Sequence, residues 1–258
     1  YNDAKAKGVH FLGMSSYCEF PGHITNPHDI LHDKNNKAWT DYDYYELTEG
    51  WCHCFRNPDK YITNKNIPKI LLSESDYANY DGHKPDSTVE KKYDFLYVCL
   101  KDNDKCEDGW QAYNRNWVVA KKCLDIMCNK FKLKGLLVGR INCEIPEGCH
   151  QIMELTDFME YSKYIKVYNQ CKFVFVPNIY DASPRVLTES LCFNLPGLVN
   201  RNIVGGWKYI SDKSGELFVD ENDFEDVCNK FLRKLKNNEF AARQHYIDNF
   251  GTKIYGPK

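Results

Sequence analysis

The stretch that decides the fold is DASPRVLTESLCFNLPGLVN, residues 181–200, which directly follows the apolar run CKFVFVPN at 171–178. Ser183 is a residue type that caps helices, and Pro184 suits the first helical position, so a helix is predicted over 184–193. The segment PGLVN after it has the apolar character of a strand. Strand, capped helix and strand in direct succession are typical of an α/β domain with a parallel sheet.

Apolar runs and amphipathic segments alternate through the rest of residues 93–236. YDFLYVCL at 93–100 and KGLLVG at 134–139 are nearly unbroken apolar runs, typical of strands buried on both faces of a parallel sheet. Apolar residues recur at helical spacing over 117–131 and over 224–235, as in helices that cover such a sheet. The pattern predicts a doubly wound α/β domain.

Residues 1–92 are predicted to form a second, smaller α/β lobe. GVHFLGMSS at 8–16 and IPKILLSES at 67–75 have the pattern of buried strands that end in small polar residues. The polar segment 81–92 contains Gly and Pro and is expected to link this lobe to the larger domain. Residues 237–258 are predicted to be helical and to pack back on the N-terminal lobe.

Composition narrows the class of protein. The 258-residue chain is 43% hydrophobic and has a formal net charge of -2. Proteins that coat nucleic acid usually carry a basic excess, so a small molecule or a sugar polymer is the expected partner, and nucleic acid is not. No run of about 18 apolar residues is present, so no transmembrane segment is expected. A targeting segment upstream of the first residue stays an open possibility.

Cysteine and histidine spacing argues against a metal centre. The chain contains 12 cysteines without a C-x-x-C pair, and Cys52, His53 and Cys54 are too close together for a four-ligand zinc set. His23 and His28 lack a matching partner motif. We therefore expect reduced thiols in a cytoplasmic compartment, with neither a bound metal nor a cofactor.

The helix that begins near Ser183 would present its free N–H groups and positive dipole end beyond the preceding strand. In open α/β sheets this edge binds ligands. Arg185 adds a planar cation suited to a diphosphate, and Glu189 is placed to accept hydrogen bonds from ribose hydroxyls. A nucleotide diphosphate therefore suits this turn. An ordinary capped helix with two solvated charges is the alternative interpretation.

The same residues resemble the donor-binding segment of GT-B glycosyltransferases. Asp181 and Glu189 match the acid, seven intervening residues and glutamate of that family. SPRVLTES followed by LPGLVN is similar to the exostosin-type signature, S-P-R-x-L-x-E-A before an I-P-V strand. EYSKYIKVYNQCKFVFVPN at 160–178 and GGWKYISDKSGELF at 205–218 look like the flanking elements. The resemblance covers about residues 93–235.

The resemblance implies two Rossmann-like lobes with a crevice between them, the first lobe being small. It implies metal-independent transfer of a sugar from a nucleotide diphosphate, with a UDP-sugar favoured, to a glycan acceptor hydroxyl. The chain resembles compact viral exostosin-like transferases, in particular chlorovirus xylosyltransferases. UDP-xylose as the donor and the cytoplasm of a host cell as the location are implied by this resemblance alone. Asp181 departs from the glutamate of the retaining group, Asn194 replaces the usual glycine, and the first lobe is short.

Cations on neighbouring strand ends complete the predicted donor site. Lys101 follows YDFLYVCL and Arg140 follows KGLLVG, on the same rim as Ser183. There they can neutralise a diphosphate without a metal, and plain loop charges are the alternative interpretation. The predicted donor-binding residues are Lys101, Arg140, Asp181, Ser183, Pro184, Arg185, Val186 and Glu189.

Exostosin-type enzymes invert the anomeric centre, and inversion needs a general base within hydrogen-bond reach of the acceptor hydroxyl. Glu19 and His23 follow the first predicted strand, and Asp76 follows IPKILLSES, so all three are expected to face the crevice from the N-terminal lobe. They are the candidate catalytic residues, although any one such residue is more often structural. The alternative for the whole chain is a carbohydrate- or nucleotide-binding module that kept the fold without catalysis.

Overall fold

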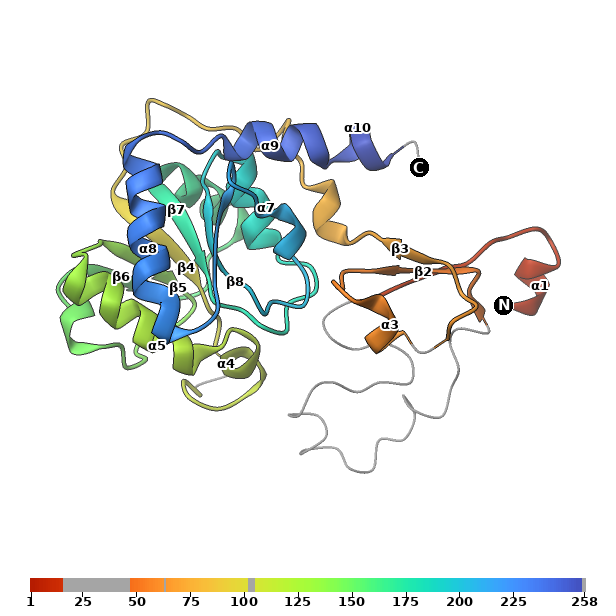
Figure 1. The fold of residues 1–258 in the computed structure, drawn as a ribbon, viewed down its shortest axis with the longest axis horizontal. Helices are drawn as coiled ribbons and strands as arrows, with labels where there is room; N and C mark the ends of the chain where they lie inside the picture. Colours follow the sequence, from red (N-terminus) through yellow and green to blue (C-terminus); the bar gives the residue numbers. More distant parts are fainter. Residues whose placement is uncertain (16–46, 63, 102–104, 257–258) are drawn as a thin grey trace.

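The computed structural model describes residues 1–15, 47–62, 64–101 and 105–256, and this part contains two β-sheets (Figure 1). All strand pairs in both sheets are parallel. The larger sheet has the spatial order β6 (Met153–Thr156), β5 (Gly135–Val138), β4 (Tyr93–Val98), β7 (Cys171–Val176), β8 (Gly197–Asn200) and β9 (Gly215–Phe218). The smaller sheet has the order β1 (Leu12–Met14), β2 (Gly50–His53) and β3 (Lys69–Leu71).

Both faces of the larger sheet are covered by helices, which explains why its central strands are apolar throughout. Side chains alternate between the faces along a strand. In β4, Phe95 and Tyr97 are buried in one cluster and Leu96 in another. The first face packs against α4 (Trp110–Asn114), α5 (Trp117–Asp125) and α8 (Glu221–Lys236), and the second carries α6 (Tyr161–Val167), α7 (Arg185–Cys192) and α9 (Ala242–Asn249).

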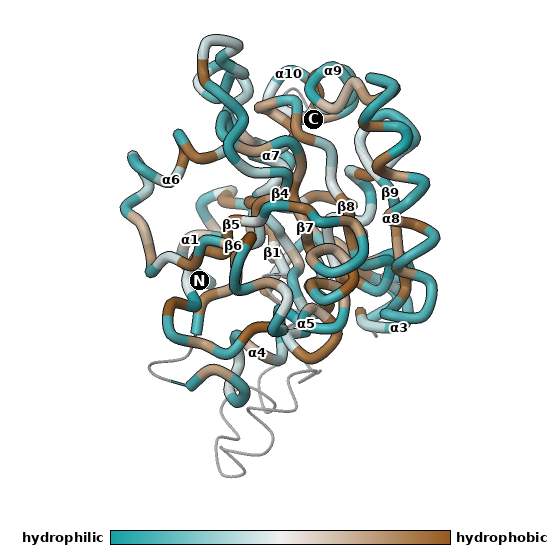
Figure 2. The backbone as a smooth tube through the Cα atoms, turned by 90° about the vertical axis from the view of Figure 1, so that its left-hand side faces the viewer, coloured by the Kyte–Doolittle hydropathy of each residue, from teal (hydrophilic) through white to brown (hydrophobic). Residues whose placement is uncertain are grey.

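Hydrophobic residues concentrate in the central strands, whereas the outer loops and helices are more polar (Figure 2). A capping box begins α8. The side chain of Asp220 accepts from the N–H of Asn222, and the side chain of Asp223 accepts from the N–H of Asp220. None of the helices in the described residues combines the length and the apolar character needed to cross a membrane.

The smaller sheet is built around one tryptophan. Trp51 of β2 is 6% exposed, and its ring lies against Gly13 of β1, where a Cβ atom would stand 2.2 Å from the ring. A side chain at position 13 would therefore displace Trp51. Two short helices, α1 (Asn2–Lys5) and α3 (Pro58–Tyr61), accompany this sheet.

The C-terminal helices lie along the junction between the two sheets (Figure 1). α9 packs against α7, and the hydroxyl of Tyr246 in α9 donates to the carbonyl of Ser75 at 2.7 Å. The N–H of Gly251, just before α10 (Thr252–Tyr255), donates to the carbonyl of Asp76 at 2.7 Å. The C-terminal segment is therefore hydrogen-bonded to the residues just after β3. The domain boundaries at 92 and 236 stay predictions.

The predicted doubly wound α/β class is confirmed, with β4, β5, β7 and β8 at the apolar runs quoted above. Two strands were not predicted. β2 lies in a segment rich in aromatic and polar residues, and β6 is the stretch MELT, in which apolar and polar residues are mixed and no apolar run stands out.

Two disulfides correct the prediction of reduced thiols throughout. Cys106 pairs with Cys143, and Cys128 pairs with Cys149, with Cα atoms 5.6 Å and 5.2 Å apart. The partners are 37 and 21 residues apart in sequence and meet only because the fold brings their segments together. Spacing alone therefore carried no sign of the pairing. The other cysteines among the described residues are free and buried.

Candidate functional site

The strand order of the larger sheet reverses between β4 and β7. The chain proceeds outward from β4 to β5 and β6, then returns to β7 and continues outward to β8 and β9. Ligands of open α/β sheets bind beyond the carboxyl ends of the strands at such a switch point. Residues 99–101 follow β4 there, and residues 177–184 follow β7. The predicted donor turn therefore lies at the switch point.

Asp181 is held by three donors in the turn after β7. Nη1 of Arg115 forms an ion pair with Oδ2, and Nδ2 of Asn178 donates to the same oxygen at 2.9 Å. The N–H of Ser183 donates to Oδ1 at 3.2 Å. The negative charge is thus neutralised within the protein, and the carboxylate orders the turn.

Arg115 was not predicted as a site residue. It directly follows α4, in the stretch GWQAYNRNW. This stretch contains no motif from which a cation next to the end of a strand could be predicted. Burial lowers the pKa of its guanidinium, but the charge of Asp181 and the hydrogen bond to it outweigh burial and raise that pKa. Nε of Arg115 is buried without a hydrogen-bond partner in the described part of the chain.

α7 begins at Arg185, one residue later than predicted, with Pro184 in the N-cap position. Ser183 does not cap it: its Oγ accepts from the N–H of Ser75 at 3.0 Å and lies 2.8 Å from the Ser75 Oγ, which joins the turn to the segment after β3. Gly206 packs on this turn with φ +85°, and a Cβ there would stand 2.4 Å from Pro184. Arg185 is exposed and forms no ion pair among the described residues.

Glu189 is 7% exposed and accepts hydrogen bonds from two tyrosines. The hydroxyl of Tyr161 donates to Oε1 at 3.1 Å, and that of Tyr168 donates to Oε2 at 2.9 Å and lies 3.3 Å from the carbonyl oxygen of Val186. Burial and the charge of Glu189 raise the pKa of Tyr161 to about 12, against the opposing effect of Arg185. Both hydroxyls therefore stay protonated and act as donors.

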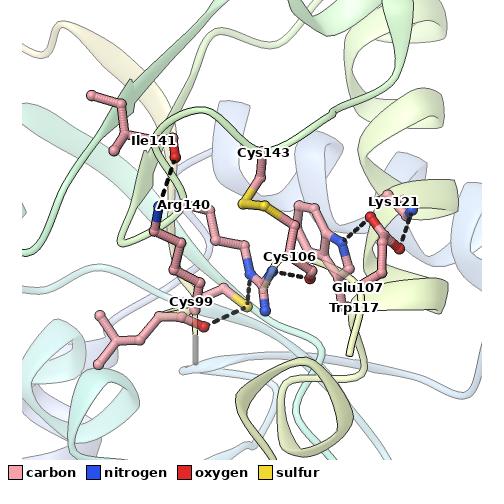
Figure 3. The surroundings of a disulfide bond; sticks show 10 residues. Cys99, Cys106, Glu107, Trp117, Lys121, Arg140, Ile141 and Cys143 are labelled. Carbon is pink, nitrogen blue, oxygen red and sulfur yellow. Dashed lines mark hydrogen bonds and ion pairs between the residues drawn. A yellow bond between two sulfur atoms is a disulfide. The ribbon is translucent and has the colours of Figure 1, made fainter. Parts of the chain in front are cut away.

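Arg140 lies inside the domain, which corrects the prediction that it lines an open rim. Its side chain is fully buried, with the guanidinium carbon 4.4 Å from the ring centroid of Trp117 (Figure 3). Nε donates to Sγ of Cys99 at 2.8 Å, and Nη1 donates to the carbonyl of Cys106. Nη2 is buried without a hydrogen-bond partner among the described residues, so the whole guanidinium is enclosed in the domain and not exposed on its rim.

Lys101, just after β4, is partly exposed. Its Nζ donates to the carbonyl of Ile141 at 3.5 Å. The disulfide between Cys106 and Cys143 ties the segment after β4 to the segment after β5. Lys101 therefore lies close to the switch point, next to the loops joined by the disulfide, and its role in donor binding stays a prediction.

Asp76 is 0% exposed, and both carboxylate oxygens are engaged. Oδ2 accepts from Nζ of Lys208 at 2.5 Å and from the N–H of Ser73 at 2.7 Å, and Oδ1 accepts from the hydroxyl of Tyr209 at 3.0 Å. This placement is at odds with the predicted general base, because a sealed carboxylate with these partners cannot reach an acceptor hydroxyl. Its contacts instead join the segment after β3 to residues 207–209.

Glu19 and His23, the other two candidate catalytic residues, lie outside the described residues and stay predictions. Among the residues that are described, no group of three or more His, Cys, Asp or Glu side chains is arranged to hold a metal ion. The donor side of the switch point is therefore the part of the candidate site whose geometry is established.

No family model matches the sequence, and no curated protein matches it. Solved structures do. TarM of S. aureus matches with a TM-score of 0.64 at 12% identity, covering 97% of this chain and 50% of TarM. The pneumococcal O-GlcNAc transferase GtfA, solved with UDP and GlcNAc, has a TM-score of 0.61 at 12% identity, covering 96% of this chain and 51% of GtfA.

HepE of Anabaena, solved in complex with UDP, matches with a TM-score of 0.67 at 10% identity, covering 98% of this chain and 72% of HepE. The chain thus spans about half the length of TarM and GtfA. At these identities the likeness concerns the fold. With its two parallel sheets and the switch point between β4 and β7, the chain has a GT-B type fold.

Proposed function

We propose that this protein transfers a sugar from a nucleotide diphosphate to a glycan hydroxyl. The observation that carries the proposal is the exposed Arg185 at the start of α7, at the switch point and one helical turn before Glu189. A helix N-terminus and a free guanidinium suit a diphosphate. A carboxylate already held by two tyrosine hydroxyls keeps lone pairs for ribose hydroxyls.

The solved structures support a UDP-sugar as the donor. GtfA and HepE were solved with UDP, and a TarM mutant was solved with UDP, α-GlcNAc-glycerol and Fondaparinux. In the proposed complex α7, Arg185 and Lys101 face the diphosphate. Arg140 supports the site indirectly: its guanidinium donates to the carbonyl of Cys106 and so fixes the loop after β4.

The finer points of the proposal are inversion, independence of metal and a pentose donor. We propose Glu19 or His23 as the base, since Asp76 is sealed at the junction. Metal independence follows if the cations neutralise the leaving diphosphate. UDP-xylose and a viral exostosin-like origin rest on the resemblance of SPRVLTES and LPGLVN.

Calorimetric titration of UDP tests the donor site. The unaltered protein is expected to bind UDP, Arg185→Ala to bind it at least about tenfold more weakly, and Arg185→Lys to recover part of the loss because lysine lacks the planar fork. Arg233→Ala on α8, exposed on the opposite face of the sheet, is the matched control. Equal affinities for all four proteins would remove Arg185 from the site.

A non-catalytic binding module is the second candidate. It is favoured by the sealed Asp76 and by the ion pair that neutralises Asp181. Incubation with a panel of UDP-sugars and glycan acceptors, with and without EDTA, separates the two. UDP release with a glycosylated product supports the transferase, whereas UDP binding without any turnover supports the module. NMR of the product's anomeric proton decides between inversion and retention.

A further inference from the structure

A groove of about 760 Å³ runs between α6 and the linker segment 79–87. Its size falls within the range of small-ligand sites. None of the predicted donor-site residues lines it, and the groove adjoins that site at Tyr161, which lines the groove and donates to Glu189. It is therefore a separate feature of the surface, on the side of α6 that faces the linker.

Two asparagines in the groove are oriented by the backbone. Oδ1 of Asn79 accepts from the N–H of Gly82 at 2.9 Å, and Oδ1 of Asn169 accepts from the N–H of Asp86 at 2.8 Å. Flipping either amide would set an NH₂ group against an N–H donor, so each Nδ2 is left as the outward donor. The groove thus offers amide donors while its amide acceptors are already used.

The charges in the groove are mainly positive. Lys84 and Lys166 both line it, and neither forms an ion pair within the part of the chain that the structure describes. Asp86 also lines it, but the hydroxyl and N–H of Thr88 donate to its Oδ1 and lower its pKa, so it is charged at neutral pH. Two unpaired cations thus face one carboxylate that is already hydrogen-bonded.

Aromatic side chains form one wall of the groove. Tyr161 is 54% exposed and lies beside His83, whose Nε2 is 3.2 Å from the tyrosine hydroxyl. His83 in turn stacks on Phe193, with ring centroids 5.7 Å apart. Nδ1 of His83 is buried without a partner among the described residues. An exposed aromatic face beside amide donors suits the C–H faces and hydroxyls of a sugar ring.

We propose that this groove binds an acidic saccharide, through carboxylate or phosphate groups on sugar rings. Donor-only amides and unpaired lysines select an acceptor-rich anion, and the face of Tyr161 selects a ring. A neutral glycan would leave both lysines without a counter-charge, and a small inorganic anion would leave the aromatic wall uncovered. The inference goes beyond the proposed transfer reaction and does not depend on it.

The test compares tetragalacturonate, its fully methyl-esterified neutral form and inorganic phosphate, each titrated into the protein by calorimetry at low salt. Tetragalacturonate is expected to bind at least about tenfold more tightly than the other two. Asn169→Asp keeps the acceptor for the N–H of Asp86 while replacing the outward donor by a negative oxygen. It is expected to weaken tetragalacturonate binding at least about tenfold, as is the double variant Lys84→Ala/Lys166→Ala.

Lys236→Ala on α8 removes an exposed lysine on the other face of the sheet and should bind like the unaltered protein. Circular dichroism melting shows that each variant is folded. Equal binding of the acid and its methyl ester, binding of phosphate as tight as that of the saccharide, or unchanged binding by the groove variants would each overturn the proposal. UDP binding is measured separately, so its failure would count against the transferase and not against the groove.

Discussion

His53 at the end of β2 is buried, and burial lowers its pKa from 6.5 to about 4, with smaller contributions from the charges of Lys208 and Lys69. Folding therefore favours the neutral imidazole. Between pH 6.5 and 4 the unfolded chain binds this proton and the folded protein does not, so acidification through that window removes stability.

The first prediction concerns this pH dependence. Between pH 7.5 and 5.0, proton uptake by His53 in the unfolded chain should lower the free energy of unfolding by about 2 kcal/mol. In the unaltered protein the N–H of Phe55 donates to Nδ1 of His53 at 3.2 Å. The variant His53→Asn keeps an acceptor for this N–H, but its side chain does not titrate. Urea unfolding at both pH values should show a smaller loss for the variant. Parallel losses would show that another group is responsible.

The second residue-scale prediction concerns Glu189. If its carboxylate holds the ribose of the donor, Glu189→Ala should weaken UDP binding by about 1.5–3 kcal/mol, the scale of a lost charged hydrogen bond. Glu147→Ala, which removes an exposed glutamate far along the chain, is the control for loss of negative charge. Calorimetry that returns the same affinity for both variants and the unaltered protein would exclude Glu189 from the site.

At the scale of elements, the loops after β4 and β5 are joined by the disulfide between Cys106 and Cys143. The same loops carry Lys101 and the carbonyl bonded by Arg140, so the covalent link orders the rim of the candidate donor site. A disulfide restricts the unfolded chain, and the effect grows with the length of the closed loop.

The prediction at this scale is that the variant Cys106→Ser/Cys143→Ser unfolds at lower denaturant, with a loss of about 2–4 kcal/mol. Peptide mapping without reductant should recover residues 106 and 143 in one linked peptide. Cys228→Ser, a free buried cysteine in α8, is the control for the side-chain change itself. A linked peptide with no loss of stability in the double variant would contradict the expected ordering of the rim.

At the scale of the whole molecule, the two lobes are held together by a buried polar network. The ammonium of Lys208 and the carboxylate of Asp76 are 6% and 0% exposed, and the hydroxyl of Tyr209 donates to the same carboxylate. Burial lowers the pKa of Lys208, and Asp76 opposes that effect. Removing one partner leaves the other charge buried and unpaired.

Asp76→Asn is therefore expected to lower the free energy of unfolding by about 3–5 kcal/mol, and Asp76→Asn/Lys208→Met to recover much of it. Chemical unfolding measures both. Full stability of the single variant would mean that the pair does not hold the junction. If the double variant is stable and also retains the sugar transfer of the unaltered protein, Asp76 has no catalytic role.

Local pattern was sufficient for the apolar strands β4, β5, β7 and β8 of the larger sheet and for α7. The strands β4, β5, β7 and β8 are apolar on both faces because helices cover both, and such runs stand out in a sequence. Ser183, Pro184 and Arg185 likewise marked the start of α7 to within one residue. β5 and β8 are equally short, but β2 (GWCH) and β6 (MELT) were missed because polar residues interrupt them and no unbroken apolar run marks them.

Only the tertiary structure decided which charges are free. Arg115 and Asp181 are 66 residues apart and Lys208 and Asp76 are 132 apart, yet both pairs form ion pairs that are largely shielded from solvent. Arg140 stands at a strand end, as predicted, but turns inward onto an indole. The sequence by itself determined a doubly wound sheet and the position of the turn that is proposed to bind the donor. Which cation is exposed and which carboxylate is sealed depends on desolvation by residues distant in sequence, which no local pattern records.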